Sequence, residues 1–298
     1  MRQSRLFIKD PDALAVFKLC EVFMLTRIIS AIVALLILLP VLWFSDSVLL
    51  PIATALVAII SLYEMFGCLK VRRNLWVSVP FYLVAAFSPF AIRYMTDRKL
   101  LLACYAACVG VLALIMLTAS VLSHRKLPTS QTASAYMTAL YIIAAFTSVV
   151  YVRDSSDKGQ FLLIMMFAAP WVTDTFAYFF GKAFGKHKLI PDVSPKKTVE
   201  GSVAGIICCT LVILGYALVC SRIWGLQCNY AILAALGVLL SIVGQIGDLA
   251  MSVIKREYNI KDYGKIMPGH GGALDRFDSV LAVAIVLAAA EIFVDVFA

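Results

Sequence analysis

Apolar runs of about 20 residues follow one another along almost the whole chain. They cover about residues 28–44, 48–68, 75–92, 100–122, 134–152, 160–180, 203–221, 230–252 and 279–297. A helix of this length crosses a hydrocarbon core of roughly 30 Å. Only 15% of the 298 residues are charged, against about a quarter in soluble domains. The runs are continuous and not alternating, which argues against a barrel. We therefore predict an all-α, polytopic integral membrane protein with about nine transmembrane helices.

The positive charges are unevenly divided between the two ends of these helices. Twenty of the 26 Lys and Arg residues lie in the N-terminal arm and in the loops after the second, fourth, sixth and eighth runs. The remaining six are Arg93, Arg98, Lys99, Arg153, Lys158 and Arg222. Because Lys and Arg accumulate in cytoplasmic loops, we predict a cytoplasmic N-terminus and an external C-terminus. The two longest basic loops then share the cytoplasmic face.

We predict that residues 1–298 form one integral membrane domain. Residues 1–27 are expected to form an interfacial N-terminal segment, 28–152 the scaffold helices, and 153–298 the catalytic helices and cytoplasmic loops. The net charge of +8 lies in short loops, as membrane topology requires. We therefore expect anionic lipid or a phosphorylated substrate as partners, and no nucleic acid.

A polar stripe runs along the end of the eighth apolar run. Gln245, Asp248, Ser252 and Lys255 are separated by three, four and three residues, which places them on one face of a helix. An acid inside an apolar span is costly and usually faces protein or water. Asp248 is therefore a candidate functional residue.

The loop that follows combines glycines, cations and acids. Asp275 and Asp278 are one turn apart if a helix begins near Ala273. Magnesium binds a few carboxylate oxygens and completes its coordination with water and substrate phosphate. Carboxylates from two helices, with five Lys and Arg residues around them, predict a site for a metal-bound polyphosphate. His270 can act as a base, contact a phosphate or lie in solvent, and these interpretations stay open at this point.

A second polar segment lies between residues 174 and 201. Asp174, Tyr178, Gly181 and Gly185 share one helix face. The two glycines are consistent with a helix-packing seam or, beside the lysines at 182, 186 and 188, with an anion site. After them, Ser194-Pro195-Lys196-Lys197-Thr198 offers cations and hydroxyls to a phosphate.

Three other acids lie in apolar runs, and their roles stay open. Glu64, near the cytoplasmic end of the second run, either faces the same site or stabilises helix packing. Glu291 and Asp295 are close to the opposite end of the last run, where interface or packing roles are expected.

The polar segments together resemble the signature of CDP-diacylglycerol synthases, also called phosphatidate cytidylyltransferases. The similar residues are Asp174, Tyr178, Gly181, Ser194-Pro195-Lys196-Lys197-Thr198-x-Glu200-Gly201, Gly247-Asp248, Ser252-x-x-Lys255-Arg256, Lys261-Asp262 and Pro268-Gly269-His270-Gly271-Gly272-x-x-Asp275-Arg276-x-Asp278. The motifs cover about residues 174–279, and the earlier spans match in general character. Fixed spacing over such a length makes the resemblance specific.

The resemblance implies a nucleotidyltransferase that joins phosphatidate to CTP, forming CDP-diacylglycerol and pyrophosphate in phospholipid biosynthesis. It implies Mg²⁺, alone or with a second cation, held by Asp248 and Asp275. It also implies a homodimer in the inner (plasma) membrane of a bacterium, with the active site on the cytoplasmic face.

The candidate residues fall into two groups on this template. Catalytic candidates are Asp248, Asp275, Lys255, Arg256 and His270. Substrate-binding candidates are Asp174, Tyr178, Ser194, Lys196, Lys197, Thr198, Glu200, Ser252, Lys261, Gly271, Gly272, Arg276 and Asp278. A phosphate monoester is already anionic near neutral pH, so His270 is favoured as a phosphate or structural contact over a base.

Two alternatives remain beside this function. One is a CTP-using enzyme with another lipid, either an archaeol-type cytidylyltransferase or a polyprenol kinase. The other is a secondary transporter, which is disfavoured because the polar residues gather at one membrane face and not at the midplane.

Overall fold

The protein is built almost entirely from helices. Its structure, a computed structural model, describes residues 11–123, 127–294 and 296–297. The helices are α1 (Pro11–Trp43), α2 (Leu49–Cys68), α3 (Leu75–Tyr94), α4 (Arg98–Leu122), α5 (Thr129–Asp154), α6 (Gly159–Phe184), α7 (Val199–Trp224), α8 (Tyr230–Glu257) and α9 (Leu274–Phe293). Two short strands, β1 (Lys188–Ile190) and β2 (Ser194–Thr198), form a hairpin between α6 and α7. The prediction of a helical membrane protein is confirmed.

Among the residues that the structure describes, eight helices, α1 to α8, are long and apolar enough to cross a membrane. The predicted ninth span corresponds to α9, which differs from the others in its charges. Asp275, Arg276 and Asp278 lie in its first turns and Glu291 near its end. These charges lower the hydropathy of α9, although half of its residues are buried inside the protein.

The basic segment after α6 forms a β-hairpin, where the sequence predicts an irregular loop. The strands are antiparallel, with Lys188 opposite Thr198 and Ile190 opposite Ser194. Val193 N donates to Ile190 O at 3.3 Å across the turn. The pairing gives the backbone groups of this segment partners of their own.

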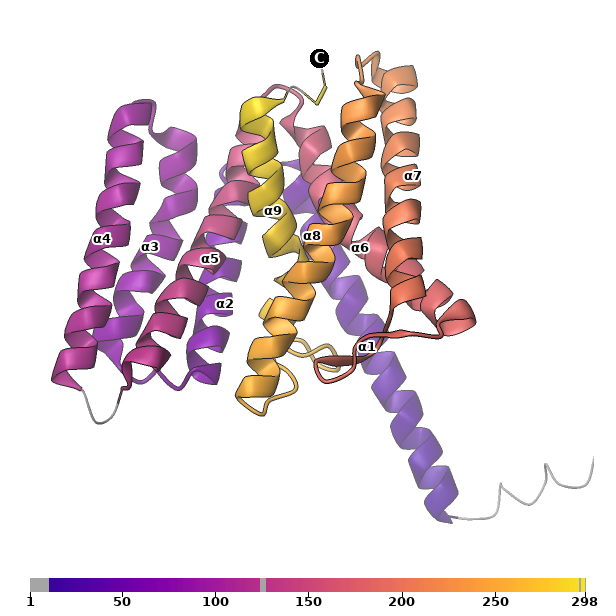
Figure 1. The fold of residues 1–298 in the computed structure, drawn as a ribbon, viewed down its shortest axis with the longest axis horizontal. Helices are drawn as coiled ribbons and strands as arrows, with labels where there is room; N and C mark the ends of the chain where they lie inside the picture. Colours follow the sequence, from indigo (N-terminus) through magenta and orange to yellow (C-terminus); the bar gives the residue numbers. More distant parts are fainter. Residues whose placement is uncertain (1–10, 124–126, 295, 298) are drawn as a thin grey trace, which may run out of the picture.

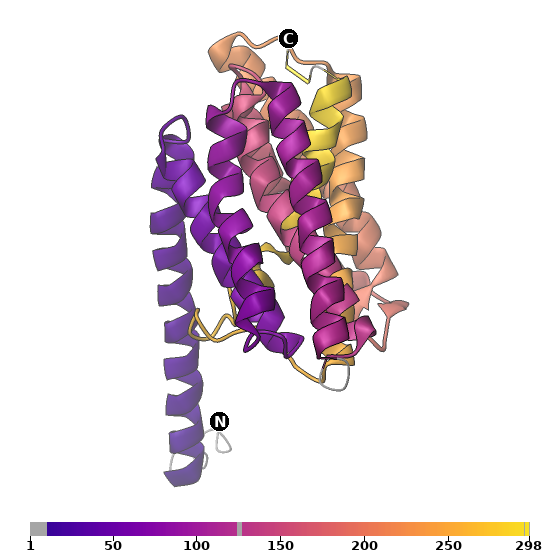
Figure 2. The ribbon, with the colours of Figure 1, turned by 90° about the vertical axis from the view of Figure 1, so that its left-hand side faces the viewer.

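Helix α1 stands partly apart from the other helices. The predicted interfacial segment 1–27 falls partly outside the described residues, and from Pro11 onward the chain is one continuous helix. The N-terminal end of α1 extends past the ends of the other helices (Figures 1 and 2). At its other end Arg93 holds the turn to α2, donating from Nη2 to Ser45 O at 2.8 Å and pairing with Asp154 at 2.7 Å.

Helix α9 lies at the centre of the molecule, between α5 and α8 (Figure 1). Its buried apolar side chains belong to two hydrophobic cores. Val280, Val283 and Leu287 pack in one core with α6, α7 and α8, whereas Leu281 packs in a second core with α2 to α5. The position of α9 therefore depends on both halves of the protein.

The hairpin and the loop between α8 and α9 lie at the same end of the helices (Figures 1 and 2). The α2–α3 turn is at this end too, whereas the C-terminus is at the other (Figure 1). Near the C-terminus Ser155 Oγ donates to Glu291 Oε1 at 3.4 Å. Asp295, the other acid near the end of the last apolar run, lies outside the described residues. So do Arg2, Arg5, Lys9, Arg125 and Lys126 of the basic set.

Candidate active site

Lys197 joins two carboxylates from different helices. Its Nζ lies 2.6 Å from Asp248 Oδ2 on α8 and 3.9 Å from Asp174 Oδ1 on α6. A third acid, Asp278, lies on α9, and the charge of Asp248 acts on it. Three acids and one lysine thus meet where α6, β2, α8 and α9 converge, and the surplus of negative charge favours a cation.

Glycines allow these elements to approach closely. A methyl group at Gly181 would lie 2.8 Å from Thr198 Oγ1, and one at Gly201 would lie 2.9 Å from Gly181 Cα. Thr198 itself caps α7 by accepting from Gly201 N at 3.2 Å. A methyl at Gly247 would lie 2.9 Å from Asp278 O, so α8 and α9 also touch beside the acids. The structure thus uses Gly181 for helix packing, and packing brings Lys197 to its partners.

Asp275 lies in a second, more deeply buried cluster. Its Oδ1 accepts from Lys255 Nζ at 2.8 Å, and its Oδ2 accepts from Tyr263 N at 2.8 Å and Gly272 N at 3.0 Å. The Tyr263 hydroxyl donates to Met251 O at 2.8 Å, and burial raises the pKa of this hydroxyl. The Asp275 carboxylate therefore links Lys255, at the end of α8, to Tyr263 and Gly272 of the following loop.

His270 contacts α1, which the sequence did not predict. His270 Nδ1 and Ser30 Oγ share a hydrogen bond of 2.6 Å, and Arg27 Nε donates to Gly269 O at 2.9 Å. Burial and the positive charges of Arg276 and Arg27 lower the pKa of His270. These contacts support a structural or binding role for a neutral His270.

The hairpin is organised by Glu200. This carboxylate accepts from Lys186 N at 3.1 Å and pairs with His187 Nδ1 at 2.6 Å. The hairpin also contacts the end of α8, because Arg256 Nε donates to Val193 O at 3.3 Å. The two basic segments that the sequence placed on one face are thus in contact.

The other candidate residues differ in their burial and in their contacts with these clusters. Ser252 is buried on α8 in the same stripe as Asp248 and Lys255, which confirms the predicted helical spacing. Arg276 is exposed at the start of α9, where its charge acts on Asp174 and His270. Tyr178, Lys196 and Lys261 are exposed, and Ser194 begins β2. Gly271 packs against Asp275 and Asp262, and Gly272 donates to Asp275.

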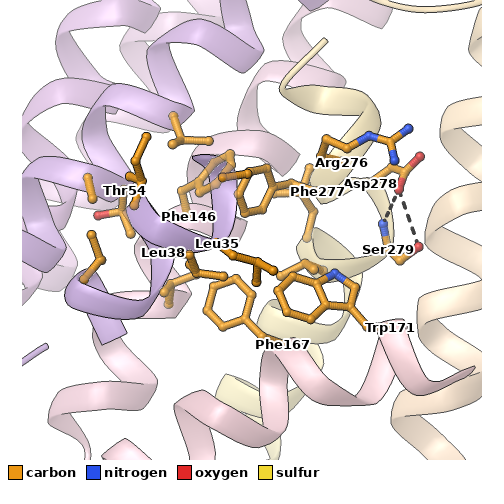
Figure 3. Close-up of a pocket in the computed structure, with 18 of the residues that line it drawn as sticks. Leu35, Leu38, Thr54, Phe146, Phe167, Trp171, Arg276, Phe277, Asp278 and Ser279 are labelled. Atoms are coloured by element: carbon orange, nitrogen blue, oxygen red, sulfur yellow. Dashed lines mark hydrogen bonds between the residues drawn. The ribbon is translucent and has the colours of Figure 1, made fainter. Parts of the chain in front are cut away.

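A cavity of about 530 Å³ opens beside the acids (Figure 3). Its walls are mainly apolar and come from α1, α2, α5, α6 and α9, with Leu35, Leu38, Phe146, Phe167 and Trp171 among the lining residues. Asp174, His270, Asp275, Arg276 and Asp278 line the same cavity. An apolar chamber with a few convergent polar groups is typical of a site for a small amphipathic molecule.

The carboxylates fit a magnesium ion that is shared with a substrate. Within the described residues, no three His, Cys, Asp or Glu side chains enclose a metal site by themselves. Magnesium needs only one or two protein carboxylates, because water and substrate phosphates take the other positions. The carboxylates of Asp248 on α8 and Asp275 on α9 meet this requirement, with Asp278 as a further acid on α9.

Sequence reasoning missed or left unassigned several residues of this region. Glu64 bonds to backbone N–H groups at the start of α9, and its only signal in the sequence was an acid in an apolar run. Ser202 donates to Gln245 Oε1 beside the stripe, and Ser30 contacts His270. A lone serine in a helix carries no signal in one sequence.

The chain is similar in sequence to known proteins. The model of the cytidylyltransferase family matches residues 25–293. The phosphatidate cytidylyltransferase of Staphylococcus epidermidis is 35% identical over 261 residues, which cover 87% of this chain and 96% of that protein. Those of Staphylococcus saprophyticus and Staphylococcus aureus are 34% identical over 266 and 262 residues, with the same coverage. The chain therefore belongs to the cytidylyltransferase family.

Proposed function

We propose that this protein transfers the cytidylyl group of CTP to phosphatidate, forming CDP-diacylglycerol and pyrophosphate. One observation carries the proposal: Asp174 and Asp278 of the acid-and-lysine cluster line an apolar cavity that reaches into the helices. Such an arrangement can hold a charged nucleotide and a lipid tail side by side. The similarity to proteins named phosphatidate cytidylyltransferase supports the same substrates.

For this reaction the protein has mainly to position the two substrates and to stabilise the charge on their phosphates. An oxygen of the phosphatidate phosphate attacks the α-phosphorus of CTP, a new P–O–P bond forms, and the bond to the β-phosphate breaks to release pyrophosphate. The attacking phosphate is already anionic, so no general base is needed. Lys197 and Arg276 can bind the phosphates and stabilise the charge that develops on them.

We propose that Asp248 and Asp275 hold magnesium, as the family resemblance implies, with Asp278 as a further acid of the site. When bound, Mg²⁺ supplies positive charge that stabilises the triphosphate and orients it for in-line displacement. Asp275 Oδ1 accepts from Lys255 and its Oδ2 accepts from two backbone N–H groups. Asp275 can bind the ion through a lone pair that these bonds leave open, whereas Asp248 can exchange Lys197 for it.

The lipid tail of phosphatidate fits the apolar part of the cavity. Arg276 lies on the same turn of α9 as Asp278 and lines the cavity (Figure 3). A phosphate headgroup placed there would meet the guanidinium and lie near the acid cluster. The acyl chains would extend along α1, α2 and α5 toward lipid.

We propose that the site faces the cytoplasm of a bacterial cell and that the N-terminus is cytoplasmic and the C-terminus external. The bias of Lys and Arg toward the loops at the site's end supports this orientation. A homodimer is expected from the family resemblance. A cysteine label at the C-terminus should react only from the external side.

The test uses purified protein, CTP and magnesium with three lipids in parallel. Phosphatidate should give a CDP-lipid and pyrophosphate. Turnover with the phosphorylated archaeal ether lipid and not with phosphatidate would identify an archaeol-type cytidylyltransferase. Phosphorylation of a polyprenol would identify a kinase, and inactivity with all three would contradict the proposed function.

A further inference from the structure

Glu64 of α2 reaches the start of α9 from the other half of the protein. Its side chain is buried, and its carboxylate accepts from Ala273 N at 3.1 Å and from Leu274 N at 2.9 Å. These two residues immediately precede Asp275. The acid therefore acts where the loop between α8 and α9 ends and α9 begins.

This end of α9 has no cap of its own. The first N–H groups of a helix lack partners within the helix, and Ser, Thr, Asp or Asn usually supplies one. Here the N-cap residue is Ala273, which has no side-chain acceptor. By contrast, α7 and α8 are capped locally by Thr198 and Asn229. Glu64 replaces the missing cap from a distant part of the sequence.

Two glycines close around the Glu64 carboxylate. A methyl group at Gly264 or at Gly272 would overlap the carboxylate oxygens. Neither glycine has a positive φ angle, so close approach is the reason for its small size. The two ends of the loop between Gly264 and Gly272 thus converge on one acid of α2.

The contacts continue directly to Asp275. Its Oδ2 accepts from Gly272 N at 3.0 Å, so Asp275 and Glu64 together satisfy the N–H groups of residues 272, 273 and 274. The start of α9 is therefore filled by the protein's own carboxylates and cannot serve as a phosphate site. Substrate phosphate must rely on side-chain cations instead.

We propose that Glu64 is a positioning residue that fixes Asp275, and through it Lys255, in the geometry needed for cytidylyl transfer. The inference rests on the proposed function for its kinetic part. It also makes α2, a scaffold helix in the sequence-based division, part of the catalytic assembly.

The central variant is Glu64→Gln, which keeps the size of the side chain. An amide group can accept from only one of the two N–H groups and turns its own NH₂ toward the other. We expect kcat to fall at least tenfold, with KM for CTP and for phosphatidate changed less than about threefold. Glu64→Asp, which keeps the charge on a shorter chain, should recover part of kcat.

Hydrogen–deuterium exchange without substrates gives a readout that does not depend on the reaction. In Glu64→Gln the amides of residues 263–275 should exchange faster, whereas those of α3 and α4 should be unchanged. Ser61→Ala is the matched control, because Ser61 is buried one turn earlier on α2 and its hydroxyl has no partner among the described residues. Its kcat and its exchange should match the parent protein.

A double substitution covers the case in which Glu64→Gln does not fold. Gly272→Ala should lower kcat because its new methyl group meets the Glu64 carboxylate. Most of this loss of kcat should disappear when Gly272→Ala is made in a Glu64→Ala background. Unchanged exchange at 263–275, a loss confined to KM, or strictly additive effects of the two substitutions would overturn the proposal. Inactive parent protein with faster exchange in Glu64→Gln would refute the proposed function and leave the capping role standing.

Discussion

The two polar segments that meet at the site differ in how firmly they are held. In the α8–α9 region, the side chains of Lys255 and Asp275 are 10% and 3% exposed. Around Lys197 of the hairpin, the side chains of Lys197 and of Asp248 on α8 are 22% and 23% exposed, and that of Asp174 on α6 is 48% exposed. A partly exposed ion pair contributes little to stability, whereas a buried pair is costly to break. Lys197 can therefore exchange Asp248 for a substrate phosphate, while the buried pair keeps the frame of the site fixed.

Substitution of the two predicted metal ligands should separate activity from stability. Asp248→Asn and Asp275→Asn should each lower kcat by about a thousandfold, because each removes a preorganised charge from the reacting groups. Asp275→Asn should also lower the unfolding free energy by about 3–5 kcal/mol, because it leaves Lys255 buried without its counter-charge. Asp248→Asn should change the unfolding free energy by less than about 1 kcal/mol. Turnover assays and thermal unfolding in detergent measure both quantities.

Asp154→Asn is the matched control for this pair. Asp154 forms an ion pair with Arg93 at the other end of the helices, far from the acid cluster. Its loss should lower stability and leave kcat unchanged. Near-normal turnover in Asp248→Asn or Asp275→Asn would exclude that residue as an essential metal ligand.

Separate substitutions of the neighbouring Lys196 and Lys197 on β2 test whether CTP binding depends on the position of one lysine or on the total positive charge of the hairpin. Lys197→Met should raise KM for CTP by about a hundredfold, since a phosphate contact to a cation is worth about 1.5–3 kcal/mol. Lys196→Met removes the same charge from an exposed position and should change KM less than about threefold. Equal effects of the two substitutions would mean that only the overall positive charge attracts the nucleotide.

The glycine contact between α6 and α7 should be sensitive to one added methyl group. Gly181→Ala places that methyl 2.8 Å from Thr198 Oγ1, which should cost about 1–3 kcal/mol of stability and displace β2. Gly215→Ala is the control, because nothing lies within 4 Å of its new methyl. Equal unfolding temperatures for the two variants would contradict the packing role.

The smallest effect is expected at His270. Because its pKa is below the ordinary 6.5, the unfolded chain takes up a proton before the folded protein does. Stability should therefore be highest above about pH 6.5 and fall as the pH is lowered toward the folded pKa of His270. His270→Gln should remove this fall and change kcat near neutral pH less than about threefold. A much larger loss of kcat would identify His270 as a base.

Much of this organisation follows from the sequence because its causes are local. Helix length and apolar content predict the spans, and the three- and four-residue spacing places Asp248 and Lys255 on one face of α8. The capping of α9 by Glu64 and the bond between Ser30 and His270 join residues more than 200 positions apart. No local pattern encodes such contacts. The hairpin was missed because its strands are too short to show alternation.

The most direct test of the account follows the phosphates of CTP. Purified protein is given phosphatidate, magnesium and CTP labelled either at the α- or at the γ-phosphate. Attack at the α-phosphorus predicts that the α label enters the lipid and the γ label leaves as pyrophosphate. Transfer of the γ label to the lipid would show phosphoryl transfer instead and would contradict the account.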